Sequence, residues 1–144
     1  MTEANVALTR QLVDAYNGSD AEAAIALCSP DVVWVPQSTD VEGVYRGHEG
    51  VRRYFENIGA VWESIKFEVE EYHDLGDRLY ALGVVRATSR GSQVELEQPG
   101  AALYEFRNGK AVRGATYVGP DPSLEKVDEH LSRGTNAEMH EDLA

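Results

Sequence analysis

The dipeptide Asn108-Gly109 constrains this chain of 144 residues more than any other feature. Strand-forming residues flank it on both sides, and Asn-Gly is the strongest short-range signal for a two-residue hairpin turn because both residues tolerate positive φ. A simple two-residue turn would place Tyr104 opposite Arg113. A bulge at Gly109 would shift the second strand by one residue and reverse its faces. The sequence therefore predicts the hairpin and leaves the facing of residues 112–118 open.

The hydrophobic period changes from about 3.6 residues to 2 residues near Ile65, which indicates helices before this point and strands after it. The predicted helices cover residues 4–17, 21–28 and 50–63. The predicted strands cover residues 32–35, 66–72, 79–88 and 94–97 and the two arms of the hairpin. Pro99-Gly100 is expected to interrupt the strand before the hairpin and to bend the sheet. The stretch Asp121-Pro122-Ser123 is expected to start a short helix that ends at about Leu131, with Pro122 in its first turn.

Helices followed by strands that must bury one face predict an α+β cone: three N-terminal helices packed on a strongly curved, mixed or antiparallel sheet, with a short C-terminal helix. We expect residues 1–131 to form a single domain and residues 132–144 to form a polar, flexible tail. The strand over 79–88 is apolar on both faces, and the three helices can cover only one of them. We therefore expect a homodimer through the convex face of the sheet.

The charge and composition of the chain limit the kinds of partner that it can bind. The net charge is −12, from 13 basic and 25 acidic residues, which argues against nucleic acid or an anionic membrane. No apolar run reaches the length of a membrane span. The single cysteine, Cys28, favours a reducing compartment, so we expect a cytoplasmic protein. The glycines lack the spacing that cradles phosphate, and no second histidine supports His73 in a metal site, so we expect neither a cofactor nor a metal.

Several segments carry a family pattern. The run Tyr16-Asn17-Gly18-Ser19-Asp20 follows the first helix, Pro30-Asp31-Val32-Val33-Trp34 leads into the first strand, and Tyr45-Arg46-Gly47 precedes the third helix. Over roughly residues 4–128 the chain resembles the SnoaL-like branch of the nuclear-transport-factor-2-like superfamily, which has a cystatin-like α+β fold. The matching positions are turns, caps and core residues, so they specify a fold better than a function.

The resemblance implies a conical pocket between the helices and the concave sheet, often holding a hydrophobic small molecule. Related enzymes include steroid isomerases, polyketide cyclases, dehydratases and epoxide hydrolases, and other relatives are not enzymes. Ketosteroid isomerases use a tyrosine on the first helix, an aspartate base at the end of the first strand and an acidic donor on a late strand. The matching positions here are Leu12, Pro36 and Ala102, none of which transfers a proton. Isomerase chemistry of that type is therefore disfavoured.

The expected cavity lies between the first helix, the third helix and the sheet, and its lining is largely aromatic. Period-two spacing places Trp34 and Pro36 on one strand face, and Ala102 and Tyr104 on another. Each of these side chains is also explained as plain core, with the tyrosine hydroxyls adding polar specificity. The predicted lining consists of Leu12, Tyr16, Trp34, Pro36, Tyr54, Phe55, Trp62, Ala102 and Tyr104.

Four polar residues are the candidates for acid–base catalysis. Arg86 and Glu97 flank a turn almost symmetrically, so antiparallel pairing brings them together, either in the pocket or as an ion pair on the surface or at a dimer seam. His73 is a natural acid–base group or part of a solvated turn. Asp121 follows the last strand, where some SnoaL-like proteins carry an acid, and it equally fits a helix N-cap.

Two classes of function remain. One is a cofactor-free enzyme, of the isomerase, cyclase, dehydratase or hydrolase type, that acts on a hydrophobic small molecule by acid–base catalysis. The other is a non-catalytic module that binds a small molecule or dimerises. Polar groups converging deep in a closed cavity favour the enzyme, and an entirely apolar or open cavity favours the binding module.

Overall fold

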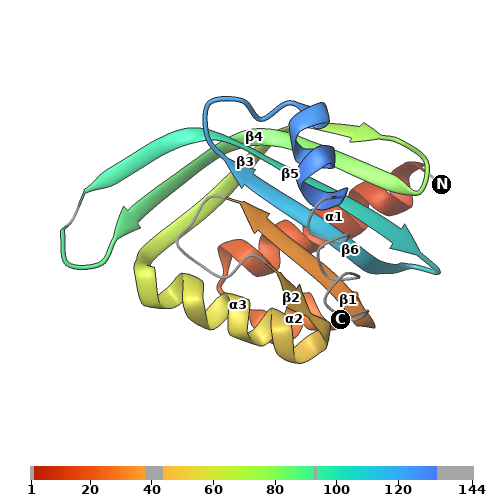
Figure 1. The fold of residues 1–144 in the computed structure, drawn as a ribbon, viewed down its shortest axis with the longest axis horizontal. Helices are drawn as coiled ribbons and strands as arrows, with labels where there is room; N and C mark the ends of the chain where they lie inside the picture. The colour runs from red at the N-terminus through yellow and green to blue at the C-terminus, as the bar shows by residue number, and fades with distance from the viewer. Residues whose placement is uncertain (1, 38–43, 93, 133–144) are drawn as a thin grey trace, which may run out of the picture.

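The computed structural model describes residues 2–37, 44–92 and 94–132. A curved six-stranded sheet carries three helices on its concave side, and the sheet does not close into a barrel (Figure 1). This architecture confirms the predicted α+β cone. The helices are α1 (Thr2–Asn17), α2 (Ala21–Ile25) and α3 (Gly47–Val61). The strands are β1 (Cys28–Gln37), β2 (Tyr45–Arg46), β3 (Trp62–Asp74), β4 (Arg78–Ser89), β5 (Glu95–Arg107) and β6 (Lys110–Val118).

The sheet is mixed. Its strand order is β2-β1-β6-β5-β4-β3, and β1 runs parallel to β6 while all other neighbours are antiparallel. The second helix is shorter than predicted, since Cys28 begins β1 instead of ending α2. The predicted interruption at Pro99-Gly100 is wrong, because β4 pairs with β5 through both residues. The proline is tolerated because β6 pairs with β5 only from Gly100 onward, so at Pro99 the strand is paired with a neighbouring strand on one side only. Residues 133–144 of the predicted tail lie outside the described residues.

The Asn108-Gly109 turn has the predicted form, with φ angles of 54° and 77°. Both values lie in the left-handed region that a two-residue hairpin turn of this type requires. The bulge is not at Gly109, since β6 instead contains one extra residue, Val112, relative to β5. This bulge places Tyr104 opposite Gly114, where a simple two-residue turn would have placed it opposite Arg113. The facing of the last strand follows from that single insertion.

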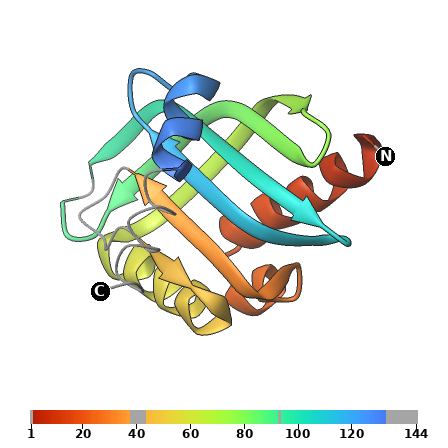
Figure 2. The ribbon, with the colours of Figure 1, turned by 45° about the vertical axis from the view of Figure 1, so that its right-hand side comes forward.

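Both faces of the sheet carry apolar clusters. The concave face packs against α1, α2 and α3 around Trp34, Tyr54 and Tyr104. On the outer face, a helix over residues 124–132 packs Val127 and Leu131 into a second apolar cluster with residues of β1, β4, β5 and β6. Figures 1 and 2 show this helix lying across the sheet on the side opposite α1 and α3.

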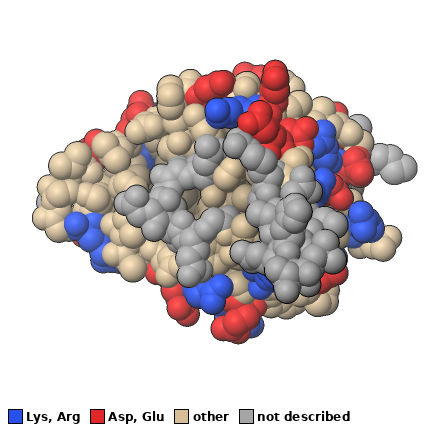
Figure 3. All heavy atoms as spheres, viewed as in Figure 1, with Lys and Arg blue, Asp and Glu red and all other residues tan. Residues whose placement is uncertain are grey.

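The helix over residues 124–132, called the outer helix below, weakens the argument for a homodimer. That expectation rested on an apolar strand face with nothing to cover it, and the chain's own helix over residues 124–132 covers much of that face. Where this helix lies, the apolar face is already covered and does not require a second subunit to cover it. On the face seen in Figure 3, Lys and Arg side chains lie among Asp and Glu side chains and do not gather into one basic patch. Within the described ranges, no helix is long and apolar enough to cross a membrane.

Asn17 fastens α1 to the free edge of the sheet. Its Nδ2 donates to the Phe67 carbonyl at 3.0 Å, and its Oδ1 accepts from the Phe67 N–H at 2.8 Å. Lys66 Nζ also donates to the Asn17 carbonyl oxygen. Since β3 is an edge strand, the amide satisfies two backbone groups that no neighbouring strand pairs. The sequence pattern after the first helix therefore has a structural role at this position.

We predict that Asn17→Ala lowers the free energy of unfolding by about 2–3 kcal/mol, because both backbone groups of Phe67 lose their partner. Urea denaturation measures the change. Asn5→Ala is the matched control on the same helix, since Asn5 Nδ2 makes one exposed hydrogen bond, to the Gly76 carbonyl at 2.9 Å. The control should cost less than about 1 kcal/mol. Equal losses in the two variants would contradict the role of Asn17.

Candidate functional site

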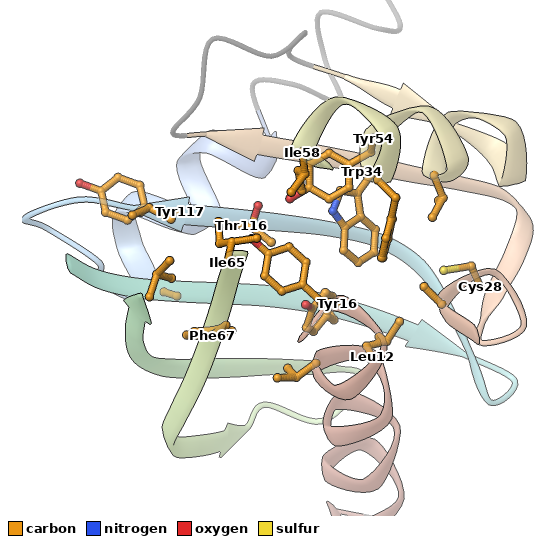
Figure 4. Close-up of a pocket in the computed structure, with 18 residues that line it drawn as sticks. Leu12, Tyr16, Cys28, Trp34, Tyr54, Ile58, Ile65, Phe67, Thr116 and Tyr117 are labelled. Atoms are coloured by element: carbon orange, nitrogen blue, oxygen red, sulfur yellow. The ribbon is translucent and has the colours of Figure 1, made fainter. Parts of the chain in front are cut away.

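A largely enclosed cavity of about 50 Å³ lies between the helices and the concave face of the sheet (Figure 4). It is lined mainly by apolar and aromatic side chains from the three helices and from the strands β1, β3, β4, β5 and β6. An adjoining chamber of about 160 Å³ is lined by Trp62, Leu96 and Gln98, among others. The two spaces share Ile65, Val85 and Val118. These shared side chains place the adjoining chamber directly next to the inner cavity.

An aromatic cluster closes the inner cavity. The Trp34 ring lies 5.3 Å from the Tyr104 ring and 6.4 Å from the Tyr54 ring, measured between centroids. Gly114 of β6 pairs with Trp34 on one side and with Tyr104 on the other. A Cβ atom at Gly114 would lie 2.8 Å from Tyr104 Cδ1 and 3.2 Å from Trp34 Cζ3. The missing side chain is therefore what lets the two rings meet over the central strand.

The ionisable groups of the lining are weak acids whose protonated forms are favoured. Burial raises the pKa of Tyr54 to about 12 and the pKa of Cys28 to about 11. Burial, together with the neighbouring phenols, raises the pKa values of Tyr16 and Tyr104 as well. At neutral pH these three hydroxyls and the thiol stay protonated. They can donate hydrogen bonds, and they do not act as bases.

Trp34 contributes a buried donor. Its Nε1 makes no hydrogen bond of acceptable length and angle to any described residue. The Tyr54 hydroxyl is close enough to Trp34 and Thr116 for both to lower its pKa, although less than burial raises it. This proximity does not amount to a bond at the indole nitrogen, because a hydrogen bond requires both distance and alignment.

The structure brings most of the predicted lining together. Trp62 lines the adjoining chamber and not the inner cavity. Pro36 and Ala102 are buried, but neither is among the described residues that line the cavity. Pro36 instead accepts a hydrogen bond through its carbonyl from His130 Nε2 at 3.2 Å. The predicted residues that do line the inner cavity are Leu12, Tyr16, Trp34, Tyr54, Phe55 and Tyr104.

Arg86 and Glu97 stand directly opposite each other on β4 and β5, so the predicted pairing is confirmed. They lie outside the cavity, because Val85 faces inward and the next residue of the strand faces outward. Arg86 Nε lies 2.7 Å from Glu68 Oε1, and Arg86 Nη1 lies 3.1 Å from Glu97 Oε2. The Arg86 and Glu97 side chains are each 55% exposed. An exposed ion pair of this kind stabilises a fold by about 0–1 kcal/mol.

His73 and Asp121 also lie away from the cavity. His73 Nε2 is 2.8 Å from Glu71 Oε1, and both side chains are about half exposed. Asp121 is exposed in the turn before the outer helix, where its Oδ1 accepts from the Ser123 N–H at 3.3 Å. Ser123, and not Asp121, caps that helix, since its Oγ accepts from the Lys126 N–H at 3.4 Å. The catalytic roles of the four candidates stay predictions that this geometry does not support.

Sequence reasoning missed Thr116 and Gly114. Both belong to β6, and Thr116 lines the cavity two residues beyond Gly114. Their facing depends on the bulge at Val112, which reverses the alternation of the strand relative to a simple hairpin. The only signal for this site was the glycine itself in an otherwise regular strand, which often marks a close approach of a neighbouring group.

The curved sheet and the helices on its concave side define an α+β cone. The chain belongs to the SnoaL-like domain family, whose model matches residues 9–114. A comparison with curated protein sequences gave no match.

Solved structures share the fold. An NTF2-like protein of unknown function from Burkholderia pseudomallei is 19% identical, with a TM-score of 0.73, covering 89% of this chain and 97% of its own. A protein with a ketosteroid-isomerase-like fold from Catenulispora acidiphila, in complex with trimethylamine, is 16% identical with a TM-score of 0.72, covering 84% and 92%. TerC, co-crystallised with polyporic acid, is 18% identical with a TM-score of 0.73, covering 90% and 98%.

We predict that Gly114→Ala lowers the free energy of unfolding by about 1–3 kcal/mol, because the new methyl group collides with the Tyr104 and Trp34 rings. Thermal or urea denaturation measures the loss. Gly59→Ala is the control, since a Cβ at Gly59 meets nothing within 4 Å. That variant lies near the end of α3 and should be neutral or stabilising. If Gly114→Ala were equally neutral, the two rings would not be packed as described.

We predict that the Cys28 thiol makes the free energy of unfolding decrease at high pH. Burial raises the pKa of its thiol to about 11 in the folded protein, while an unfolded thiol titrates at about 8.5. The stabilisation from the neutral buried thiol is complete below the lower value and is lost as pH rises toward the higher one. The stability advantage of the wild type over Cys28→Ala should therefore shrink by about 2 kcal/mol between pH 8 and pH 10.5. A constant difference across this range, measured by urea denaturation, would show that the thiol is not shielded.

Proposed function

We propose that this protein binds an uncharged hydrophobic small molecule in the cavity between the helices and the concave face of the sheet. The observation that carries the proposal is an enclosed, mainly aromatic cavity whose polar atoms are protonated donors such as the Tyr16 and Tyr104 hydroxyls. Concave, mostly apolar spaces with a few convergent polar groups are the usual form of small-molecule sites. Two structures of similar fold were determined with a small organic molecule, trimethylamine and polyporic acid, which supports the binding of a small molecule. Both compounds are ionisable, so the preference for an uncharged ligand rests on the lining of this cavity alone.

The preference for an uncharged ligand follows from the lining. Among the described residues that line the inner cavity there is no lysine, arginine, histidine, aspartate or glutamate. A charged ligand would leave water without gaining an opposite charge, and burying an unpaired ion is far more costly than burying a hydrogen-bonded neutral group. The cavity therefore selects neutral molecules.

A cofactor-free acid–base enzyme is the second candidate. The family to which the chain belongs includes isomerases and cyclases, and the protonated hydroxyls of Tyr16, Tyr54 and Tyr104 can polarise a ligand carbonyl. Proton abstraction also needs a base that titrates near neutral pH. The phenols and the Cys28 thiol have raised pKa values and do not meet that requirement. Binding is therefore better supported than acid–base turnover.

Dimerisation through the outer face has weaker support than binding. The helix over residues 124–132 buries Val127 and Leu131 against that face, and the Arg86 ion pairs occupy the part of β4 nearer the β4–β5 turn. A partner seated there would have to cover charged side chains, which are depleted in the cores of stable interfaces. The ligand cavity, in contrast, is complete within one chain as described.

We predict that Val85→Phe abolishes or strongly weakens ligand binding, because Val85 lines both the inner cavity and the adjoining chamber. The larger phenyl ring would reduce the volume of both spaces. The affinity for neutral single-ring compounds such as ethylbenzene should fall about tenfold or more. Titrations followed by amide shifts in ¹H–¹⁵N spectra measure the affinity.

Leu75→Phe is the control for this change. Leu75 is 38% exposed and lies in the turn between β3 and β4, away from both spaces. This variant should bind ethylbenzene within about twofold of the wild type, since a distant exposed side chain contributes little. Unchanged affinity in Val85→Phe would place the binding site elsewhere on the molecule.

A further inference from the structure

The indole nitrogens of Trp34 and Trp62 are both buried without a hydrogen-bond partner among the described residues, and that of Trp34 belongs to the inner cavity. Trp34 is 8% exposed, and its Nε1 is buried without a hydrogen-bond partner among the described residues. An indole nitrogen can only donate. Buried donors are almost always paired in native proteins, so an orphan of this kind calls for an explanation.

The indole cannot easily turn toward another partner. Its ring is held between Tyr104 and Tyr54 and rests beside Gly114, where there is no room for a Cβ atom. Figure 4 shows the Trp34 nitrogen turned toward Tyr54 and Thr116 inside the cavity. Because Tyr54 and Thr116 also line the inner cavity, the Trp34 N–H lies at the wall of the space in which we place the ligand. An acceptor that enters this space satisfies the donor.

The two spaces differ in what they can hold. The inner cavity measures about 50 Å³ and the adjoining chamber about 160 Å³. A cavity of about 150 Å³ admits one benzene ring, and one water molecule needs about 10–15 Å³. The adjoining chamber thus has room for a single ring, while the inner cavity has room for a small polar substituent. Val85 and Val118 line both spaces.

We propose that Trp34 Nε1 donates a hydrogen bond to an uncharged acceptor, of the ketone or aldehyde type, on a compact single-ring ligand. The carbonyl oxygen occupies the inner cavity beside Trp34, and the ring lies in the chamber lined by Trp62 and Leu96. This inference rests on the proposed function and adds the chemical class of the ligand. The lack of a cation in the described lining excludes the carboxylate analogue.

Three matched compounds test the proposal: acetophenone, which has a neutral acceptor, ethylbenzene, which has none, and benzoate, which is charged. The chain contains two tryptophans, so a ¹H–¹⁵N spectrum shows two indole N–H signals, and Trp34→Phe identifies that of Trp34. Acetophenone should move the Trp34 indole proton downfield, whereas ethylbenzene should shift amide signals without that movement. Benzoate should bind at least about tenfold more weakly than acetophenone.

The Trp34→Phe variant keeps an aromatic ring and removes the donor. Its affinity for acetophenone should fall about five- to tenfold, and its affinity for ethylbenzene should stay within about twofold. Trp62→Phe is the matched control, since the Trp62 Nε1 is also buried without a described partner. The control should not change the preference for acetophenone over ethylbenzene. If Trp34→Phe does not fold, Trp62→Phe identifies the two signals and the wild-type indole shifts decide.

The outcomes separate the two proposals. Equal affinity for acetophenone and ethylbenzene, with an unmoved Trp34 indole signal, overturns the acceptor site and leaves the binding function standing. A downfield shift of the Trp62 signal in place of the Trp34 signal also overturns it. Tight binding of benzoate overturns the requirement for an uncharged ligand. If no neutral compound shifts any amide of the cavity, the binding function itself fails.

Discussion

The contact of Trp34 with Tyr104 across Gly114 is the interaction on which the rest of the structure depends. These three residues sit on the three adjacent strands β1, β5 and β6, so their packing holds the centre of the sheet together. The same rings close one wall of the cavity. Because glycine has no Cβ, the rings approach the backbone of β6 more closely than any other residue would permit. One small residue thereby couples the stability of the sheet to the shape of the site.

Desolvation then decides the chemistry of that site. The helices exclude water from the concave face, and burial keeps Tyr16, Tyr54 and Tyr104 protonated. The cavity is consequently rich in donors and poor in bases, which suits the recognition of a neutral acceptor better than proton abstraction. Charged side chains such as Arg86 remain half exposed on the outer face, where solvent screens them. The fold is shared with enzymes, but the function depends on which side chains reach the interior.

Burial of the outer face shows how tertiary structure changes an inference about assembly. The sequence of β4 is apolar on both sides, which requires cover on both sides of the sheet. The cover comes from the chain itself, through Val127 and Leu131 of the outer helix. Local pattern predicted a helix there, but it could not tell whether that helix packs on the sheet or lies free in solvent. A short helix thus covers part of the face for which the sequence alone had suggested a second subunit.

The sequence by itself determined most of the elements and half of the cavity lining contributed by helices. Helical and strand periods are local, and so is the turn chemistry of Asn108-Gly109, so these features were predictable. Only the tertiary structure decided which face of each strand points inward. The bulge at Val112 turns Gly114 and Thr116 toward the site, and a shift of one residue separates inward Val85 from outward Arg86. Strand facing has a period of two, so one inserted residue reverses it, and its position depends on contacts between strands distant in sequence.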